Sequence, residues 1–156
     1  MNFQKIRLAV YALYLTNLYG FKLQRVEEPL EKKRLRLEYA QTLLKKLKIS
    51  VEVKNAEKLV DGKQYLVVSN HRGIIDPLIL EMALENSDIF GLWISKKELY
   101  TSPFFGVFVR NAGALLLDRE KSQMAGFLKI LKQKLKRETL SLFFQREPAI
   151  KVKSHL

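Results

Sequence analysis

Residues 65–80, YLVVSNHRGIIDPLIL, constrain the fold of this chain more than any other stretch. The run from Tyr65 to Ser69 is short, apolar and rich in Val and Leu, as is typical of a buried strand. Asp76 followed by Pro77 predicts a helix start, because Asp is a favoured N-cap and Pro fits the first helical position. The stretch therefore predicts a strand, a short bend and a helix.

His71 falls at the end of this predicted strand, and Asp76 opens the predicted helix. The bend between them can bring a carboxylate to the Nδ1 side of an imidazole. A histidine oriented in this way is suited to taking a proton from a hydroxyl. The structural alternative is that one of only two histidines is a structural residue and that Asp76 is merely a cap, since a lone acid–histidine pair is a weak motif.

Cationic side chains follow two further predicted strands. Lys96 and Lys97 come after the apolar run 89–95, and Arg119 comes two residues after the run 113–117. Ligands of α/β proteins gather beyond the carboxyl ends of strands, where ammonium and guanidinium groups can hold a phosphate. The alternatives are a solvated loop for the lysines and a surface ion pair for Arg119.

The remaining pattern predicts helices interspersed with short strands, which is the rhythm of an α/β fold with a layered sheet flanked by helices. The further predicted elements are an amphipathic helix over 35–47, a strand over 51–53, a turn at Asp61-Gly62, a continued helix over 78–85, a short helix over 103–109, a basic amphipathic helix over 126–137 and a final strand over 139–144.

The net charge of +12 over 156 residues is large. It predicts an anionic partner, either a membrane surface or a nucleic acid. Cysteine is absent, which excludes disulfides and thiolate metal sites. The length predicts one domain with a sizeable core.

The N-terminal run 8–19, LAVYALYLTNLY, is apolar and aromatic and has cations on both sides. Twelve residues rise only about 18 Å as a helix, short of the ~30 Å hydrocarbon core. We therefore expect residues 1–34, which end in a polar break over 27–34, to form a helical segment lying in the membrane interface. The alternative is a plain amphipathic helix packed on the domain.

Two blocks resemble the glycerolipid acyltransferases, the family of bacterial 1-acylglycerol-3-phosphate O-acyltransferases. The first is SNH-x4-DP at residues 69–77, and the second is ISKKELYTSPFFGVFVRNAGALLLDRE at residues 94–120. Their order and separation are those of the family, and the resemblance covers about residues 35–144.

The resemblance implies transfer of a fatty acyl group from a thioester donor to the hydroxyl of lysophosphatidate (1-acylglycerol 3-phosphate) in phospholipid biosynthesis. The donor is acyl-CoA or acyl carrier protein, a cosubstrate, and no metal or prosthetic group is implied. His71 is expected to be the general base and Asp76 to orient it. The expected location is the cytoplasmic face of an anionic membrane, as a peripheral or monotopic protein, with no nucleic acid partner.

The expected substrate-binding residues are three cationic side chains, which the resemblance favours as substrate ligands, and two backbone positions on the bend. Lys96, Lys97 and Arg119 are the candidates for binding the acceptor's phosphate. Backbone amides near Arg72 and Gly73 are the candidates for donors to the oxyanion. The region 103–109 borders the acyl-chain groove in this family.

The chain departs from the family after Phe144. Family members continue with Pro-Glu-Gly-Thr-Arg, whereas this chain reads QREPAIKVKSHL. One C restored after the Phe144 codon permits the family's residues in succession, so a single-nucleotide deletion is our hypothesis. We expect a partial acyltransferase domain over 35–144, incomplete at the C-terminus, an out-of-frame tail over 145–156, and low activity and solubility.

The competing hypothesis is a non-catalytic basic module that binds membrane or nucleic acid. The net charge and the lysine-rich helices support it. Most aromatic residues lie in apolar runs, whereas a base-stacking platform needs them interleaved with basic residues on an exposed face. Nucleic acid is therefore the less favoured partner.

Overall fold

A computed structural model describes residues 3–58, 65–70, 73–87, 89, 91–117, 124–137 and 141–146. In chain order, its elements are α1 (Phe3–Gln24), α2 (Pro29–Leu47), the 3-10 helix η1 (Ala56–Lys58), β1 (Leu66–Asn70), α3 (Asp76–Ala83), β2 (Gly91–Lys96), α4 (Lys97–Tyr100), α5 (Gly106–Asn111), β3 (Leu115–Leu117), α6 (Met124–Arg137) and β4 (Ser141–Arg146).

The strands form a parallel sheet in the order β1-β4-β2-β3. The last strand of the chain, β4, thus lies between β1 and β2. Asn70 pairs with Arg146, and Lys96 pairs with Leu117, so the carboxyl ends of all four strands meet at one edge. This arrangement confirms the predicted α/β class.

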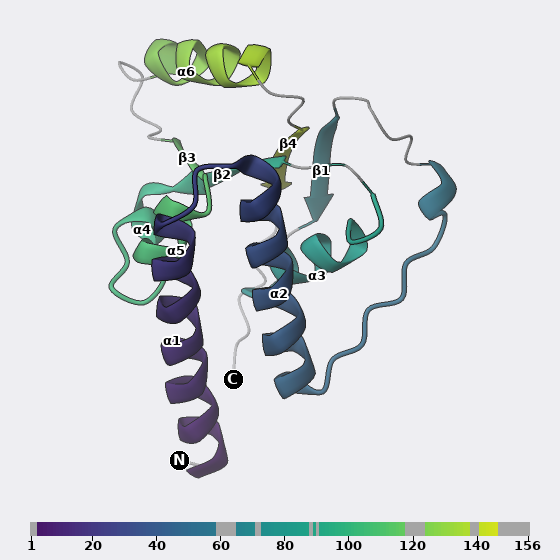
Figure 1. The fold of residues 1–156 in the computed structure, drawn as a ribbon, viewed down its shortest axis with the longest axis vertical. Helices are drawn as coiled ribbons and strands as arrows, with labels where there is room; N and C mark the ends of the chain where they lie inside the picture. The colour runs from purple at the N-terminus through teal and green to yellow at the C-terminus, as the bar shows by residue number, and fades with distance from the viewer. Residues whose placement is uncertain are drawn as a thin grey trace, which may run out of the picture.

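Helices cover both faces of the sheet (Figure 1). On one face, Leu92 of β2 packs in a cluster with Phe127 and Leu131 of α6. On the other face, Trp93 of β2 packs against the cluster that contains Leu84, just after α3. Successive residues of a strand point to opposite faces, so β2 is held between the two helical layers. The predicted layered arrangement is confirmed.

Strand β1 is less buried than its composition predicted. It lies at the edge of the described sheet, next to β4 only. Leu66 and Val68 are 68% and 58% exposed, whereas Val67 packs on the α3 side. The expectation of a buried strand is therefore wrong for one of its faces.

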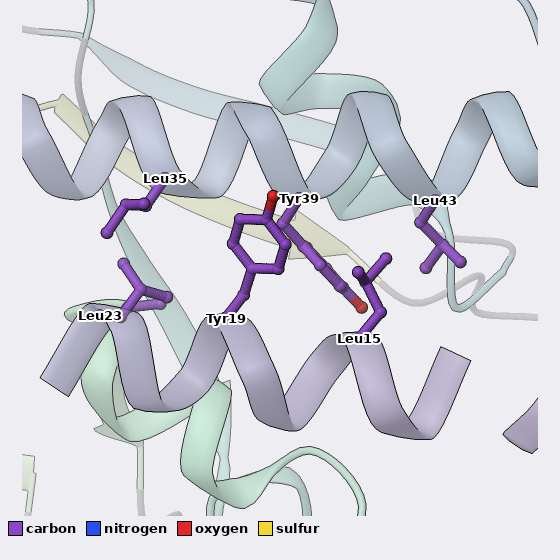
Figure 2. Close-up of a cluster of buried hydrophobic side chains, with 7 residues drawn as sticks. Leu15, Tyr19, Leu23, Leu35, Tyr39 and Leu43 are labelled. Atoms are coloured by element: carbon purple, nitrogen blue, oxygen red, sulfur yellow. The ribbon is translucent and has the colours of Figure 1, made fainter. Parts of the chain in front are cut away.

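Helices α1 and α2 form an antiparallel hairpin that contributes most of the largest buried cluster (Figures 1 and 2). Each helix presents residues spaced four apart, which fall on one face. Figure 2 shows these side chains facing one another: Leu15, Tyr19 and Leu23 from α1, and Leu35, Tyr39 and Leu43 from α2.

The hairpin packs on the domain through paired polar groups as well as apolar ones. The hydroxyls of Thr16 and Tyr39 lie 2.8 Å apart in the buried interface. The Asn111 side chain of α5 donates to the Gly20 carbonyl of α1 at 3.0 Å. The hairpin is therefore part of the core of the described fold.

The predicted bounds of the N-terminal helices were wrong. Helix α1 has 22 residues, about 33 Å at the usual rise, whereas the apolar run predicted 12. Among the described residues, no helix combines the length and the apolar character needed to cross a bilayer.

The predicted polar break over 27–34 is confirmed for residues 27 and 28 but is wrong for 29–34, because α2 begins at Pro29. The Glu28 carboxylate caps this helix by accepting from the Leu30 and Glu31 amides at 3.1 and 2.6 Å. The predicted strand at 51–53 has no regular structure. The predicted turn at Asp61-Gly62 lies outside the described residues.

Candidate active site

Three segments that carry predicted site residues leave the sheet at its carboxyl edge. His71 and Arg72 follow Asn70, the last residue of β1, but both lie outside the described residues. Lys96 is the last residue of β2 and Lys97 follows it, so both lie at the end of the strand, as the sequence predicted. The short helix α4 that begins at Lys97 was not predicted. Arg119 comes two residues after β3 ends at Leu117 and also lies outside the described residues.

Asp76 is held against the bend that precedes α3. Its Oδ2 accepts the Gly73 amide hydrogen at 2.8 Å, and its own amide donates to the Gly73 carbonyl at 3.1 Å. The predicted capping role was wrong by one position, because Ile75 is the N-cap residue and makes no side-chain cap bond. The half-buried carboxylate is therefore directed back to the bend instead of to the helix amides.

The Gly73 amide is already engaged in this bond. An amide hydrogen that donates to a carboxylate can serve an oxyanion only by exchanging one acceptor for the other. The expectation for Gly73 as an oxyanion donor thus requires the loop to open at Asp76, and that expectation stays a prediction.

An apolar cavity of about 130 Å³ begins directly after Asp76. Pro77 and Leu78 form part of its wall. Strand β2 and the segment 108–114, which begins in α5, supply most of the rest. The residues around it are Arg36, Pro77, Leu78, Glu81, Trp93, Ile94, Ser95, Leu99, Phe108, Val109, Ala112 and Ala114.

A buried ion pair forms part of the cavity wall. Arg36 Nε lies 3.0 Å from Glu81 Oε1, and the two side chains are 3% and 8% exposed. Trp93 Nε1 donates to the same carboxylate oxygen at 2.7 Å. Burial lowers the pKa of the Arg36 guanidinium, and the Glu81 carboxylate opposes that shift. An arginine keeps its charge even so, since its ordinary pKa is far above neutral.

The sequence reasoning missed this pair, although a signal was present. Arg36 shares a four-residue spacing with Ala40 and Leu44, which are buried on α2. A charge within an apolar stripe predicts a buried, paired side chain, because an isolated buried charge is costly. The interpretation of this helix considered only the leucines and the solvated lysines.

Comparison with known proteins places these features in a family context. A family model described as Acyltransferase matches residues 50–145, which is more than half of the chain. The match begins before β1 and ends within β4. It therefore includes the bend, Asp76 and most of the cavity wall.

Two curated relatives are similar to part of the chain. The 1-acyl-sn-glycerol-3-phosphate acyltransferase of Helicobacter pylori (strain J99 / ATCC 700824) is 40% identical over 84 residues, which are 52% of this chain and 34% of that protein. The protein of the same name from Streptococcus pneumoniae (strain ATCC BAA-255 / R6) is 33% identical over 67 residues, 42% of this chain and 25% of that protein. The matched part of the chain thus spans about a third or less of these relatives. No solved structure matches the chain.

Proposed function

Because the chain belongs to the Acyltransferase family, we propose that it transfers a fatty acyl group from a thioester donor to the hydroxyl of lysophosphatidate. The single observation that carries the proposal is the position of the Asp76 carboxylate. It is fixed on the bend five residues after His71, at the carboxyl edge of the sheet and directly beside an apolar cavity. The names of both relatives support the same acceptor.

In the proposed reaction, His71 removes the acceptor's hydroxyl proton. The oxygen then attacks the thioester carbonyl and forms the ester bond, the carbon–sulfur bond breaks, and the thiolate takes the proton from the imidazolium. Asp76 holds the imidazole in one tautomer and stabilises its charged form. Acyl-CoA and acyl carrier protein are both donors of the required chemistry.

The acceptor's phosphate is proposed to bind Lys96, Lys97 and Arg119. Lys96 and Lys97 lie at the edge where β2 ends. Arg119 follows the paired strand β3 by two residues in sequence. Such residues supply point charges and a planar fork for phosphate oxygens.

The cavity is proposed to take part of the acyl chain. Its wall is apolar apart from the Arg36–Glu81 pair and the Trp93 and Ser95 side chains. Each buried methylene contributes about 0.8 kcal/mol to binding. The helix α5, which supplies Phe108 and Val109, falls largely within the region that the resemblance assigns to the acyl groove.

We propose that the hairpin of α1 and α2 associates with an anionic membrane at the cytoplasmic face. The side of α1 opposite the core carries an exposed apolar stripe of Phe3, Ile6, Val10, Leu13, Tyr14, Leu18 and Phe21. Lys46 of α2 lies 5.1 Å from the Tyr11 ring, so the basic end of α2 adjoins the N-terminal half of α1. Apolar burial combined with lysine attraction favours the interface of anionic lipids.

Low activity of the 156-residue chain is also part of the proposal. Its support is that the codons possible for the residues after Phe144 permit Pro-Glu-Gly-Thr-Arg when the reading frame is shifted by one nucleotide. Sequencing the gene tests this directly. Codons that cannot encode those residues in the shifted frame would end the reading-frame hypothesis.

The test of the activity is a His71→Ala variant of the chain with its reading frame restored after Phe144. Loss of the general base should reduce acyl transfer to lysophosphatidate by about 100-fold or more. Binding to anionic vesicles should not change. Equal transfer by the two proteins would overturn the catalytic role of His71. Vesicle binding without transfer in either protein would favour the non-catalytic membrane-binding module.

A further inference from the structure

Helix α3 carries Asp76 at its first position and is only eight residues long. Helices shorter than about 12–15 residues are marginal in water on their own. Tertiary contacts must therefore hold α3 in place. Whatever fixes this helix also fixes the direction of the Asp76 carboxylate.

Glu81 is the buried polar anchor of α3. It lies five residues after Asp76, which is about 7.5 Å along the helix axis. One of its oxygens, Oε1, lies 3.0 Å from Arg36 Nε and accepts the Trp93 Nε1 hydrogen at 2.7 Å. The helix is thus tied to α2 on one side and to β2 on the other.

Arg36 extends the same anchor to two more points of the fold. Its Nη1 donates to the carbonyl of Gly91, where β2 begins, at 3.0 Å. It also donates to the carbonyl of Ala112, just after α5, at 3.2 Å. One planar guanidinium therefore links α2, α3, β2 and α5, which a lysine ammonium cannot do with the same geometry.

Stability alone does not account for this pair. Replacing a buried ion pair with well-packed apolar residues is often neutral or stabilising, because both charges must be desolvated. The contacts of Arg36 instead fix the relative placement of the elements around the cavity. Three of these elements, α3, β2 and α5, contribute to its wall.

We propose that Arg36 and Glu81 are positioning residues that hold α3 so that the Asp76 carboxylate stays on the bend before it. The catalytic consequence rests on the proposed function. The structural consequence does not, because the Gly73–Asp76 hydrogen bond reports the position of α3 directly.

The structural test is hydrogen exchange of the Gly73 amide in the full chain. Arg36→Lys should speed this exchange about 10-fold or more, because α3 shifts and the bond to Asp76 opens more often. The matched control is Arg34→Lys on the same helix. Arg34 is exposed and pairs with Glu31 of α2, so this variant should not change the exchange of the Gly73 amide. Trp93, the one tryptophan of the chain, gives a fluorescence readout of the same contact.

A double variant covers the case in which Arg36→Lys does not fold. Arg36→Met combined with Glu81→Leu removes both charges, so no unpaired charge stays buried. Faster Gly73 exchange in this folded variant would support the proposal. Exchange equal to that of the unchanged chain, in either variant, would overturn it.

The catalytic test measures kcat and KM separately. Displacement of Asp76 should lower kcat for acyl transfer about 10- to 100-fold, while KM for the acyl donor stays within about twofold. The lower limb of the pH profile of kcat/KM should also move to lower pH, since a carboxylate near an imidazole raises its pKa. An unchanged kcat and an unchanged pH profile would contradict the catalytic consequence of the proposal. These rates are measured in the chain with its reading frame restored after Phe144. Absence of transfer in that parent chain would instead defeat the proposed function, and Gly73 exchange would still decide the positioning role.

Discussion

Gly20 lies where α1 rests directly against α5. A methyl group at this position would lie 2.9 Å from the Phe108 amide nitrogen and 3.0 Å from Val107 Cγ1. The first of these is a backbone atom, which cannot rotate away. We predict that Gly20→Ala lowers the free energy of unfolding by about 1–3 kcal/mol, measured as a shift of the urea-unfolding midpoint.

The control for this prediction is Gly126→Ala in helix α6. Among the described residues, no atom outside the backbone of its own helix lies within 4 Å of a methyl group placed at Gly126. Alanine is a better helix former than glycine, so this change should raise the free energy of unfolding by about 0.5–1 kcal/mol. Equal destabilisation by the two substitutions would contradict the close approach of α1 and α5.

Tyr39 makes the stability of the helical hairpin sensitive to alkaline pH. Burial raises the pKa of its phenol above the ordinary value of 10.0, and the hydrogen bond with Thr16 opposes that shift. The contribution of the Tyr39 phenol to the free energy of unfolding is complete below about pH 10. It is lost as the pH rises toward the pKa of the folded state, because the unfolded chain releases the phenol's proton at a lower pH.

We therefore predict that the free energy of unfolding falls less steeply above about pH 10 in Tyr39→Phe than in the unchanged chain. Urea unfolding at a series of pH values on both sides of that point measures this. Tyr19, whose pKa burial also raises, contributes in both proteins. Identical slopes in the two proteins would mean that the Tyr39 phenol is not desolvated in the folded state.

At the scale of elements, α1 has apolar residues on two opposite sides. One side faces α2, and the other carries the exposed stripe that includes Val10, which is 60% exposed. We predict that Val10→Asn weakens binding to anionic vesicles about 10-fold. The reason is that the variant loses the favourable free energy of burying the apolar valine side chain in the membrane interface. Vesicle co-sedimentation measures the change.

Val53→Asn is the matched control, because Val53 is 43% exposed but lies outside α1. Its vesicle binding should equal that of the unchanged chain. Unchanged binding in Val10→Asn, or an equal loss in both variants, would mean that the stripe on α1 is not the membrane surface.

Local chemistry predicted the type of most elements but misplaced several of their ends. The Asp76-Pro77 pair located the start of α3 correctly to within one residue. The similar pair Glu28-Pro29 starts α2, yet the run of charges that follows it was interpreted as a break. The alternation at 51–53 predicted a strand, but a strand also requires a neighbouring strand to pair with, which the local pattern does not reveal.

At the scale of the whole molecule, the parallel sheet gathers the predicted site segments at one edge. The sequence predicted that these segments follow strands; Lys97 does so, and Lys96 is the last residue of β2. It did not predict that β4 lies between β1 and β2. Pairing between distant strands depends on the packing of the whole domain, so neither this order nor the buried Arg36–Glu81 contact could be predicted from local patterns.

The central claim, that a carboxylate on the bend assists proton removal from the acceptor's hydroxyl, is tested most directly at Asp76. Asp76→Asn keeps an oxygen that can accept the Gly73 amide hydrogen, but it removes the charge. The matched control is Glu98→Gln, the same chemical change at an exposed residue of α4. Both are made in the chain with its reading frame restored after Phe144.

The measurement is the rate of acyl transfer to lysophosphatidate at saturating acyl donor. We predict that Asp76→Asn lowers kcat by about 100-fold or more, whereas Glu98→Gln leaves it unchanged. An Asp76→Asn rate equal to that of the Glu98→Gln control would contradict the account.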